Sequence, residues 1–245
     1  MPNSPTKPVA VYTMGKVGSS SVTTALSDAG FEALQVHVLQ GGAAGVKRRI
    51  ERRPKARHLQ TSLRLLDYIE AGEAPPTISL FREPVARNVS AFFQNFERLV
   101  GGDVEQLTVA DTQRLICERV APEETQNWVD NELVGVAGVE VGRHELFRGP
   151  AVADEAAWPM LLMRSDLDDD LKSQSMRSFL KDDTITVKRS SNVTAEKAGG
   201  ELYGQIKKIG LPGAYVDACL SQAFVSSVLS PDEIEMTRSR WTESA

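Results

Sequence analysis

The sequence is poor in cysteine and histidine, with only two and three residues of these types among 245. Cys117 and Cys219 are too few for a disulfide framework or a cysteine-based metal site, so we expect both to be reduced core residues. No apolar run approaches the roughly 18 residues that a membrane-spanning helix needs, and the first residues lack the apolar core of a signal peptide. These absences predict a cytoplasmic protein without a membrane span.

Positive charge is not in excess either, because 28 Lys and Arg face 33 Asp and Glu, for a net charge of -5. Nucleic-acid-binding proteins usually present a clearly basic surface to the phosphates, so general nucleic-acid binding is not expected. An anionic ligand would have to meet local positive charge. The basic run from Lys47 to Arg57 is one such place. It reads most simply as a solvated helix face, and alternatively as a surface that attracts an anionic donor or a glycan.

The apolar segments alternate between two periods along the chain. Short apolar runs predict strands, and runs with helical spacing predict helices between them. This alternation predicts a P-loop-like, three-layer α/β/α fold with a central parallel sheet, forming a single domain over residues 1–245. The expected strands are 9–12, 33–39, 77–81 and 159–163, and the expected helices are 20–29, 59–71, one beginning near Pro84, and 171–180.

Two parts of the chain do not follow this alternation. Residues 101–157 begin at a Gly101-Gly102 break and predict a mostly helical insertion over the sheet edge, with helices at 109–120 and 126–133. The C-terminal part predicts a last short strand at 185–187, helices at 195–208 and 214–229, and a terminal helix. Ser230 supplies the N-cap of that last helix and Pro231 its first residue.

The stretch VYTMGKVGSSS, residues 11–21, follows the first predicted strand and opens the first predicted helix. Such a loop presents backbone N–H groups at the positive end of a helix dipole and is a natural anion site. The P-loop pattern G-x-x-x-x-G-K-[ST] is absent, which argues against recognition of a nucleoside triphosphate. An ordinary strand-to-helix turn is the alternative. The candidate anion-binding residues are Gly15, Lys16, Gly18, Ser19, Ser20 and Ser21.

A second loop has similar potential. In TISLFREPVARNVSAFF, Arg82 ends an apolar strand and Ser90 follows eight residues later within a helix. An arginine there can bind a phosphate through two parallel hydrogen bonds, and the serine could reach the same group. The helix also carries Phe92, Phe93 and Phe96 at helical spacing, which we interpret as core residues.

Together the two loops resemble those of the sulfotransferases that use 3'-phosphoadenosine 5'-phosphosulfate. The first family motif, approximately T-x-x-K-[ST]-G-[ST]-[ST], is matched at Thr13, Lys16, Gly18, Ser19 and Ser20, and Val17 departs from it. The second motif, an arginine followed eight residues on by a serine, is matched by Arg82 and Ser90. The resemblance implies that Lys16, Ser19 and Ser20 hold the 5'-phosphosulfate. It also implies that Arg82 and Ser90 hold the 3'-phosphate, so that the product is adenosine 3',5'-bisphosphate.

The similarity extends to a bacterial subgroup described as capsular polysaccharide synthesis proteins. YTMGKVGSSS, FREPVARNVSAFFQN and LSPDEIEMTRSRW resemble its segments, and MLLMRSDLDDDLKSQSMRSFL resembles a further family region, with Ser165 where a glutamate is usual. The subgroup's Asn...Lys-Trp-Tyr-Ser element corresponds to NVTAEKAGGELY. Asn192 and Lys197 are kept there, and Ala198-Gly199-Gly200 replace the aromatic pair and the serine. The resemblance implies an acceptor hydroxyl on a carbohydrate or glycan precursor.

Sulfuryl transfer needs positive charge on the leaving oxygen and a base for the acceptor proton. Lys16 could supply the charge without a metal, and none is expected. His37, at the end of the second strand, is the first candidate base, and His58 is the second. Glu132 and Glu140 are further alternatives.

Three other assignments remain open. By resemblance, Lys188 and Arg189 would contact the 3'-phosphate and the adenine, although a solvated strand end is the alternative. Trp128 could stack on a sugar. The alternative functions are a P-loop-like kinase of a small molecule and a non-catalytic nucleotide-binding protein of a polysaccharide pathway.

Overall fold

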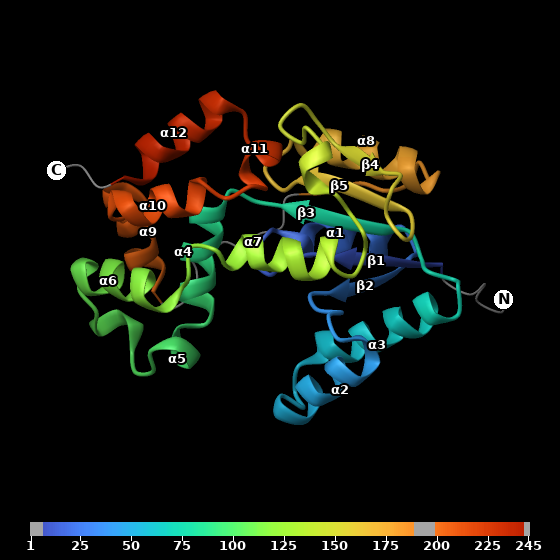
Figure 1. Ribbon diagram of the computed structural model, residues 1–245, viewed down its shortest axis with the longest axis horizontal. Coiled ribbons are helices and arrows are strands. Elements are labelled where there is room, and N and C mark those ends of the chain that lie inside the picture. The colour runs from blue at the N-terminus through green and yellow to red at the C-terminus, as the bar shows by residue number, and fades with distance from the viewer. Residues whose placement is uncertain (1–6, 189–198, 243–245) are drawn as a thin grey trace. The chain divides into compact units, whose positions relative to one another are not determined.

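The computed structural model describes residues 7–188 and 199–242 (Figure 1). The chain divides into two compact units, of which the first consists of Met1–Phe81 with Trp128–Arg189 and the second of Arg82–Asn127 with Ser190–Ala245. Some residues singled out in the sequence lie outside the described residues, namely Arg189, Asn192, Lys197 and Ala198.

A five-stranded sheet forms the centre of the first unit. Neighbouring strands pair in parallel, except for β4, which lies antiparallel to β5 at one edge. The α/β class with a mostly parallel central sheet is therefore confirmed, whereas the P-loop-like detail stays a prediction. Across the sheet, the order of the strands is β2 (Glu32–Val36), β1 (Pro8–Tyr12), β3 (Thr77–Phe81), β5 (Met160–Arg164) and β4 (Ala151–Ala153).

The strand order creates a switch point at β1. From β1 the chain passes to β2 on one side and then to β3 on the other. In open α/β sheets, ligands bind outside the carboxyl ends of the strands at such a reversal. The first loop, which begins directly after Tyr12, lies at this carboxyl end.

Helices cover both faces of the sheet. Strands β3 and β5 are buried along their whole length, which explains their continuous rather than alternating apolar sequences. One face carries α1 (Ser19–Asp28) and α8 (Asp169–Leu180), whose Leu26 and Met176 join the core cluster of β1, β3 and β5. On β2, Ala33 packs toward that cluster, and the helix α3 (Arg57–Glu70) also packs against this strand. Helix α2 (Gly42–Arg52) packs beside α3 (Figure 1).

The predicted strand at 185–187 is wrong. Ile185 and Val187 are buried in the core cluster but form no strand. Side chains of α8 satisfy their backbone, because Arg177 Nε donates to the Ile185 carbonyl oxygen and the Val187 N–H donates to Ser173 Oγ. The apolar pattern therefore predicted burial correctly. The backbone hydrogen bonds that a neighbouring strand would make are made here by side chains of α8.

The predicted insertion is shared between the two units. Its later part belongs to the first unit and contains a π-helical segment, η2 (Val129–Val134), a short 3-10 helix, η3 (Val141–Arg143), and the edge strand β4. The edge strand was not anticipated, because three residues carry too little pattern. The prediction of a single domain stays a prediction.

The second unit is helical in its described residues. Phe92 packs edge-to-face against both Phe93 and Phe96, which agrees with their interpretation as core residues. The expected helix at 214–229 is divided into two by a turn near Ser221. The helices are α4 (Pro84–Gln94), α5 (Phe96–Leu99), η1 (Val104–Gln106), α6 (Val109–Arg119), α7 (Glu124–Trp128, whose last residue belongs to the first unit), α9 (Gly200–Ile209), α10 (Gly213–Leu220), α11 (Val225–Val228) and α12 (Pro231–Trp241).

Candidate functional site

The first loop is held in place by two buried apolar residues. Met14 and Val17 are buried in the core cluster, so the backbone between them turns outward. Lys16 has φ 73° and Gly18 has φ 77°, both in the left-handed region. For a lysine this conformation costs roughly 1–2 kcal/mol relative to the right-handed one, and residues held in this way cluster at functional sites.

The loop ends at an N-terminus that is suited to an anion. Gly18 is the N-cap of the ten-residue helix α1 and offers no side chain to its N–H groups, and the first turn holds no acidic residue. The positive end of the helix dipole is therefore not neutralised by this helix itself. A phosphate or sulfate group at this position would meet backbone donors and the charge of Lys16.

The three serines of α1 have different environments. Ser19 is buried, and its Oγ accepts a hydrogen bond of 2.8 Å from Gln35 Nε2, so its own hydrogen can be donated to a ligand. Ser20 is exposed. The Ser21 hydroxyl donates to the Gly18 carbonyl oxygen over 3.0 Å, which stabilises the turn. Gln35 was not a candidate in the sequence, although its polar side chain interrupts an apolar strand.

Thr13 connects the loop to the neighbouring strand and to a histidine. Its N–H donates to the Val36 carbonyl oxygen over 3.0 Å, and its own carbonyl oxygen accepts from His37 Nδ1 over 2.6 Å. Among the residues that the structure describes, its buried Oγ1 finds no hydrogen-bond partner. An orphaned hydroxyl beside an anion-binding loop is compatible with a ligand donor or acceptor at this point.

His37 and His58 lie side by side in the first unit. Their ring centroids are 5.4 Å apart. Because a carbonyl oxygen can only accept, His37 Nδ1 carries the hydrogen of its bond to Thr13, and the neutral ring keeps its lone pair on Nε2. Burial, followed by the charges of His37 and Arg53, lowers the pKa of His58. The pair therefore combines an imidazole ring of fixed orientation with a second ring that resists protonation.

Glu132 stabilises the strand ends around the loop. Its Oε2 accepts from the Tyr12 hydroxyl over 2.5 Å and from the N–H groups of Leu39 and Gln40 over 2.7 and 3.0 Å. With this oxygen occupied by three donors and only 4% of the residue exposed, Glu132 acts as a structural brace between β1 and the chain after β2. Burial, together with the neighbouring Glu132 carboxylate, raises the pKa of Tyr12.

The other aromatic and acidic candidates have their own partners. Trp128 Nε1 donates to the His37 carbonyl oxygen over 2.8 Å, and its ring packs edge-to-face on Tyr12. Trp128 therefore positions the histidine segment. Glu140 is exposed and pairs with Arg143.

The segment after β5 meets the first loop. A Cβ added to Gly18 would lie 3.9 Å from the Cβ of Ser165, whose N–H donates to the Phe81 carbonyl oxygen over 2.7 Å. Arg164 binds both carboxylate oxygens of Asp166. Burial alone would raise the pKa of Asp166, but these bonds hold it below its usual value. Ser165, which the sequence marked only as a departure from a family pattern, therefore lies beside the first loop.

Arg82 and Ser90 lie in the second unit. Arg82 is half-buried directly before Glu83, the N-cap of α4, whose side chain accepts from the Ala86 N–H over 2.7 Å and from Trp241 Nε1. Burial raises the pKa of Glu83, although the bond from Ala86 and the charge of Arg82 act in the opposite direction. Ser90 lies within α4 and is 2% exposed.

Comparisons with protein-family models, curated proteins and solved structures give no match. The family resemblance of the two loops therefore stays a prediction.

The last predictions to compare with the structure concern the basic residues Lys188 and Arg189, a membrane span and a metal ion. Lys188 is exposed after Val187, and Arg189 lies outside the described residues. Within residues 7–188 and 199–242, no helix is long and apolar enough to cross a membrane, and no group of three or more His, Cys, Asp or Glu could hold a metal ion.

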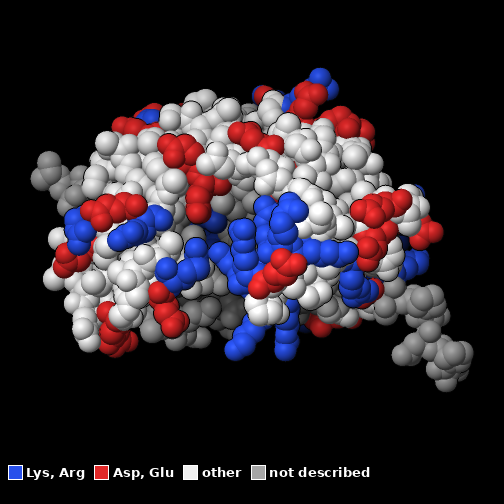
Figure 2. All heavy atoms as spheres, turned by 60° about the horizontal axis from the view of Figure 1, so that its bottom comes forward, with Lys and Arg blue, Asp and Glu red and all other residues white. Residues whose placement is uncertain are grey.

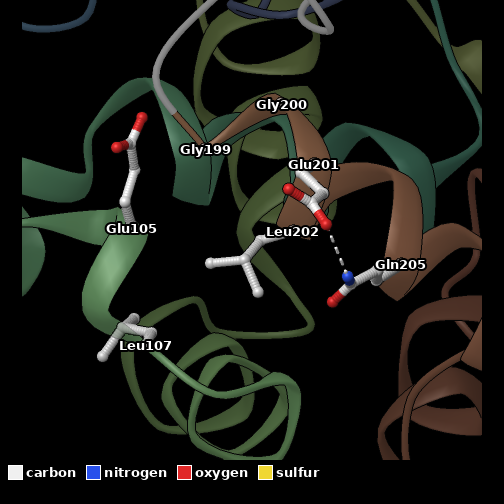
Figure 3. Close-up of a pocket in the computed structure, with 7 residues that line it drawn as sticks. All are labelled: Glu105, Leu107, Gly199, Gly200, Glu201, Leu202 and Gln205. Carbon is white, nitrogen blue, oxygen red and sulfur yellow. Dashed lines mark hydrogen bonds between the residues drawn. The ribbon is translucent and has the colours of Figure 1, made fainter.

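A cavity of about 540 Å³ in the second unit has an acidic lining. Glu105 and Glu201 are among its lining residues, and Glu201 bonds to Gln205 (Figure 3). Two carboxylates disfavour a phosphorylated or sulfated ligand, since like charges repel. We therefore do not assign the nucleotide to this cavity.

Proposed function

We propose that this protein transfers a sulfuryl group from 3'-phosphoadenosine 5'-phosphosulfate to a hydroxyl of a carbohydrate or glycan precursor. The observation that carries the proposal is the first loop. The backbone of Lys16 and that of Gly18 are both in the left-handed conformation. At the carboxyl end of β1, they lead into a helix N-terminus that has no side-chain cap. An ordinary strand-to-helix turn needs neither a strained lysine nor an uncapped helix N-terminus, whereas an anion-binding site can use both.

Donor binding is assigned to both loop motifs. Lys16, Ser19 and Ser20, with the backbone N–H groups around Gly15 and Gly18, would hold the 5'-phosphosulfate. Arg82 and Ser90 would hold the 3'-phosphate. Support comes from the Ser19 hydroxyl, whose hydrogen is not used in its bond with Gln35, and from the orphaned hydroxyl of Thr13. Lys188 and Arg189 would add positive charge near the 3'-phosphate and the adenine.

The transfer step assigns one role to each reacting side chain. The acceptor oxygen forms a bond to sulfur, and the bond from sulfur to the bridging oxygen breaks. Lys16 would stabilise the negative charge that develops on that bridging oxygen, which leaves with adenosine 3',5'-bisphosphate. His37 would accept the acceptor's proton at Nε2, since Nδ1 is held by the Thr13 carbonyl oxygen. His58 stands beside it as the second candidate base.

A calorimetric titration tests the proposal. The full chain should bind adenosine 3',5'-bisphosphate more tightly than ATP or 5'-AMP. Arg82→Ala should weaken binding of the bisphosphate about tenfold to a hundredfold and leave 5'-AMP almost unchanged, because a charged hydrogen bond to the 3'-phosphate is lost. Arg98→Ala, which removes an exposed arginine of the same unit, is the control.

Two variants of Lys16 separate charge from backbone conformation. Lys16→Ala and Lys16→Gly both remove the ammonium group, but only glycine relaxes the left-handed backbone. Both should lose turnover alike if the charge is what matters. Tight ATP binding without bisphosphate binding would instead indicate a kinase. Bisphosphate binding, with transfer equally low in the wild type and both variants, would indicate a non-catalytic nucleotide-binding protein.

A further inference from the structure

Helix α2 and its N-cap place three arginines of the basic run and two glycines on one face. Five positions, separated by four, three, one and three residues, share one helix face because 3.6 residues make a turn. The N-terminal end of this stripe consists of glycines, and the C-terminal end of arginines. Its members are Gly41, Gly45, Arg48, Arg49 and Arg52.

The glycines make this face concave. A Cβ on Gly45 would lie 2.8 Å from the Gln40 carbonyl oxygen, so only glycine allows the preceding turn to fold over the helix. Gly41, at φ 82°, is the N-cap of the helix. The result is a cavity of about 380 Å³, within the range of roughly 300–1,000 Å³ found for small-ligand sites. Its lining residues are Gln40, Gly41, Gly45, Arg48, Arg49 and Arg52.

The walls of this cavity, which we call the α2 pocket, carry positive charge, and only part of it takes part in hydrogen bonds among the residues that the structure describes. Arg49 Nη1 donates to the Gln40 carbonyl oxygen over 2.7 Å, which fixes one guanidinium in place. Arg48 and Arg52 are exposed, and neither forms an ion pair with any residue that the structure describes. Figure 2 shows Lys and Arg side chains gathered in one patch on this side of the molecule. Because the chain as a whole has a net charge of -5, this positive charge is a local feature of the surface.

The shape and lining of the α2 pocket favour some polyanions over others. A guanidinium matches the planar oxygens of carboxylates and the tetrahedral oxygens of sulfate or phosphate esters. Membrane surfaces favour flat basic faces with exposed apolar side chains, and none of the exposed large hydrophobic residues lies on α2 or α3. Single-stranded nucleic acids favour aromatic side chains for stacking, and the lining contains none. An acidic sugar residue, whose carboxylate, phosphate or sulfate group can be held by guanidinium groups without a stacking ring, fits this lining.

Hydrogen bonds within one unit connect the α2 pocket to the strand that precedes the first loop. Gln40, which lines the pocket, donates its N–H to Glu132 Oε2, and the Tyr12 hydroxyl donates to the same oxygen. Tyr12 directly precedes the loop, and His37 lies three residues before Gln40. A chain bound in the pocket is thus held by the same scaffold that positions Lys16 and His37.

We propose that the α2 pocket binds an acidic residue of a glycan chain through Arg48 and Arg52. Binding of the glycan in the α2 pocket does not depend on whether the protein transfers a sulfuryl group. Its consequence for the acceptor, namely that sulfuryl transfer acts on a glycan that already carries carboxylate, phosphate or sulfate groups, rests on the proposed function.

The test uses the full chain and fluorescently labelled oligosaccharides. Oligogalacturonate and a heparin oligosaccharide are the acidic probes, and dextran of equal length is the neutral one. We expect Arg48→Gln with Arg52→Gln to weaken acidic-probe binding at least tenfold and to leave bisphosphate binding unchanged. The matched control is Arg143→Gln with Arg148→Gln, which removes two exposed arginines of the same unit and should change binding less than twofold.

The possible outcomes separate this inference from the proposed function. Acidic probes that bind no better than dextran, or equal losses in both double variants, would overturn the inference while leaving bisphosphate binding intact. Stronger binding to phosphatidylserine vesicles than to the oligosaccharides would also overturn it. Competition by inorganic phosphate alone, at the same concentration as the oligosaccharide, would also overturn it, because the site would then be one for a free anion. Loss of the proposed function would appear separately, as absence of bisphosphate binding.

Discussion

At the scale of single residues, the first unit places strained or buried polar groups around one loop. Lys16 adopts a backbone conformation that L-residues seldom use, and Thr13 keeps a hydroxyl without a partner among the described residues. Such features cost stability and persist where the surrounding structure imposes them. The buried Met14 and Val17 impose the conformation here, because both side chains must enter the core on either side of Lys16.

The lowered pKa of His58 predicts an effect of pH on stability. Burial, together with the charges of His37 and Arg53, makes the folded protein take up this proton at a lower pH than the unfolded chain, whose histidines titrate near about 6.5. The contribution of His58 is therefore fully present above about pH 6.5 and is lost as the pH falls from there through the folded pKa. In His58→Gln, the free energy of unfolding should decline less between about pH 7 and pH 5.

Urea unfolding at a series of pH values measures this effect. Gln60→Ala, an exposed change on the same helix, should keep the pH dependence of the wild type. A His58→Gln profile parallel to that of the wild type would show that His58 takes up its proton equally in the folded and unfolded states.

At the scale of elements, helix ends are where sequence and structure agree best. Ser230 Oγ accepts from the Glu233 N–H over 3.3 Å, and Glu233 Oε2 accepts from the Ser230 N–H over 2.8 Å, which completes a capping box at the start of α12. Pro231 occupies the first helical position, where its missing N–H is not needed. The same chemistry begins α4, with Glu83 as N-cap and Pro84 after it.

Removal of this cap should cost a predictable amount of stability. Ser230→Ala leaves the Glu233 N–H without its acceptor and should lower the free energy of unfolding of the second unit by about 1 kcal/mol. Ser239→Ala, at an exposed position within the same helix, is the control and should be neutral or slightly stabilising. Chemical denaturation followed by circular dichroism measures both. Equal effects of the two variants would show that the capping box adds nothing.

At the scale of the whole molecule, charge is distributed unevenly. A chain with a net charge of -5 and a pI near 5.4 repels polyanions on average, so association with one must depend on the local field of α2. Salt shortens the range of that field, from a Debye length of about 10 Å at 0.1 M to about 3 Å at 1 M.

Association with acidic oligosaccharides should therefore slow as salt is added. Between about 0.05 and 0.5 M NaCl, the association rate constant of the wild type should fall at least tenfold, because electrostatic steering is screened. The variant Arg48→Gln with Arg52→Gln should show a much shallower dependence. Stopped-flow fluorescence measures both rates. The same salt dependence in wild type and variant would place the attracting charge outside the α2 pocket.

Elements with local signals could be predicted from the sequence. Continuous apolar runs gave the buried strands β1, β3 and β5, helical spacing gave α1 and α3, and Ser-Pro gave the start of α12. The composition of the first loop also indicated an anion site, because glycine, lysine and serine act there through their own backbone and side-chain chemistry. Each of these signals is carried by a few consecutive residues.

Features that depend on distant partners could not be predicted in this way. The strand β4 exists because β5 offers an edge, and the segment 185–187 is no strand because α8 satisfies its backbone. The hydrogen on His37 Nδ1 is set by the Thr13 carbonyl oxygen, and Ser165 lies beside Gly18 of the first loop although the two are far apart in the sequence. The α2 pocket arises because the Gln40 turn folds over Gly45. Local pattern cannot encode such contacts, since their free energy belongs to pairs of residues that the folded chain alone brings together.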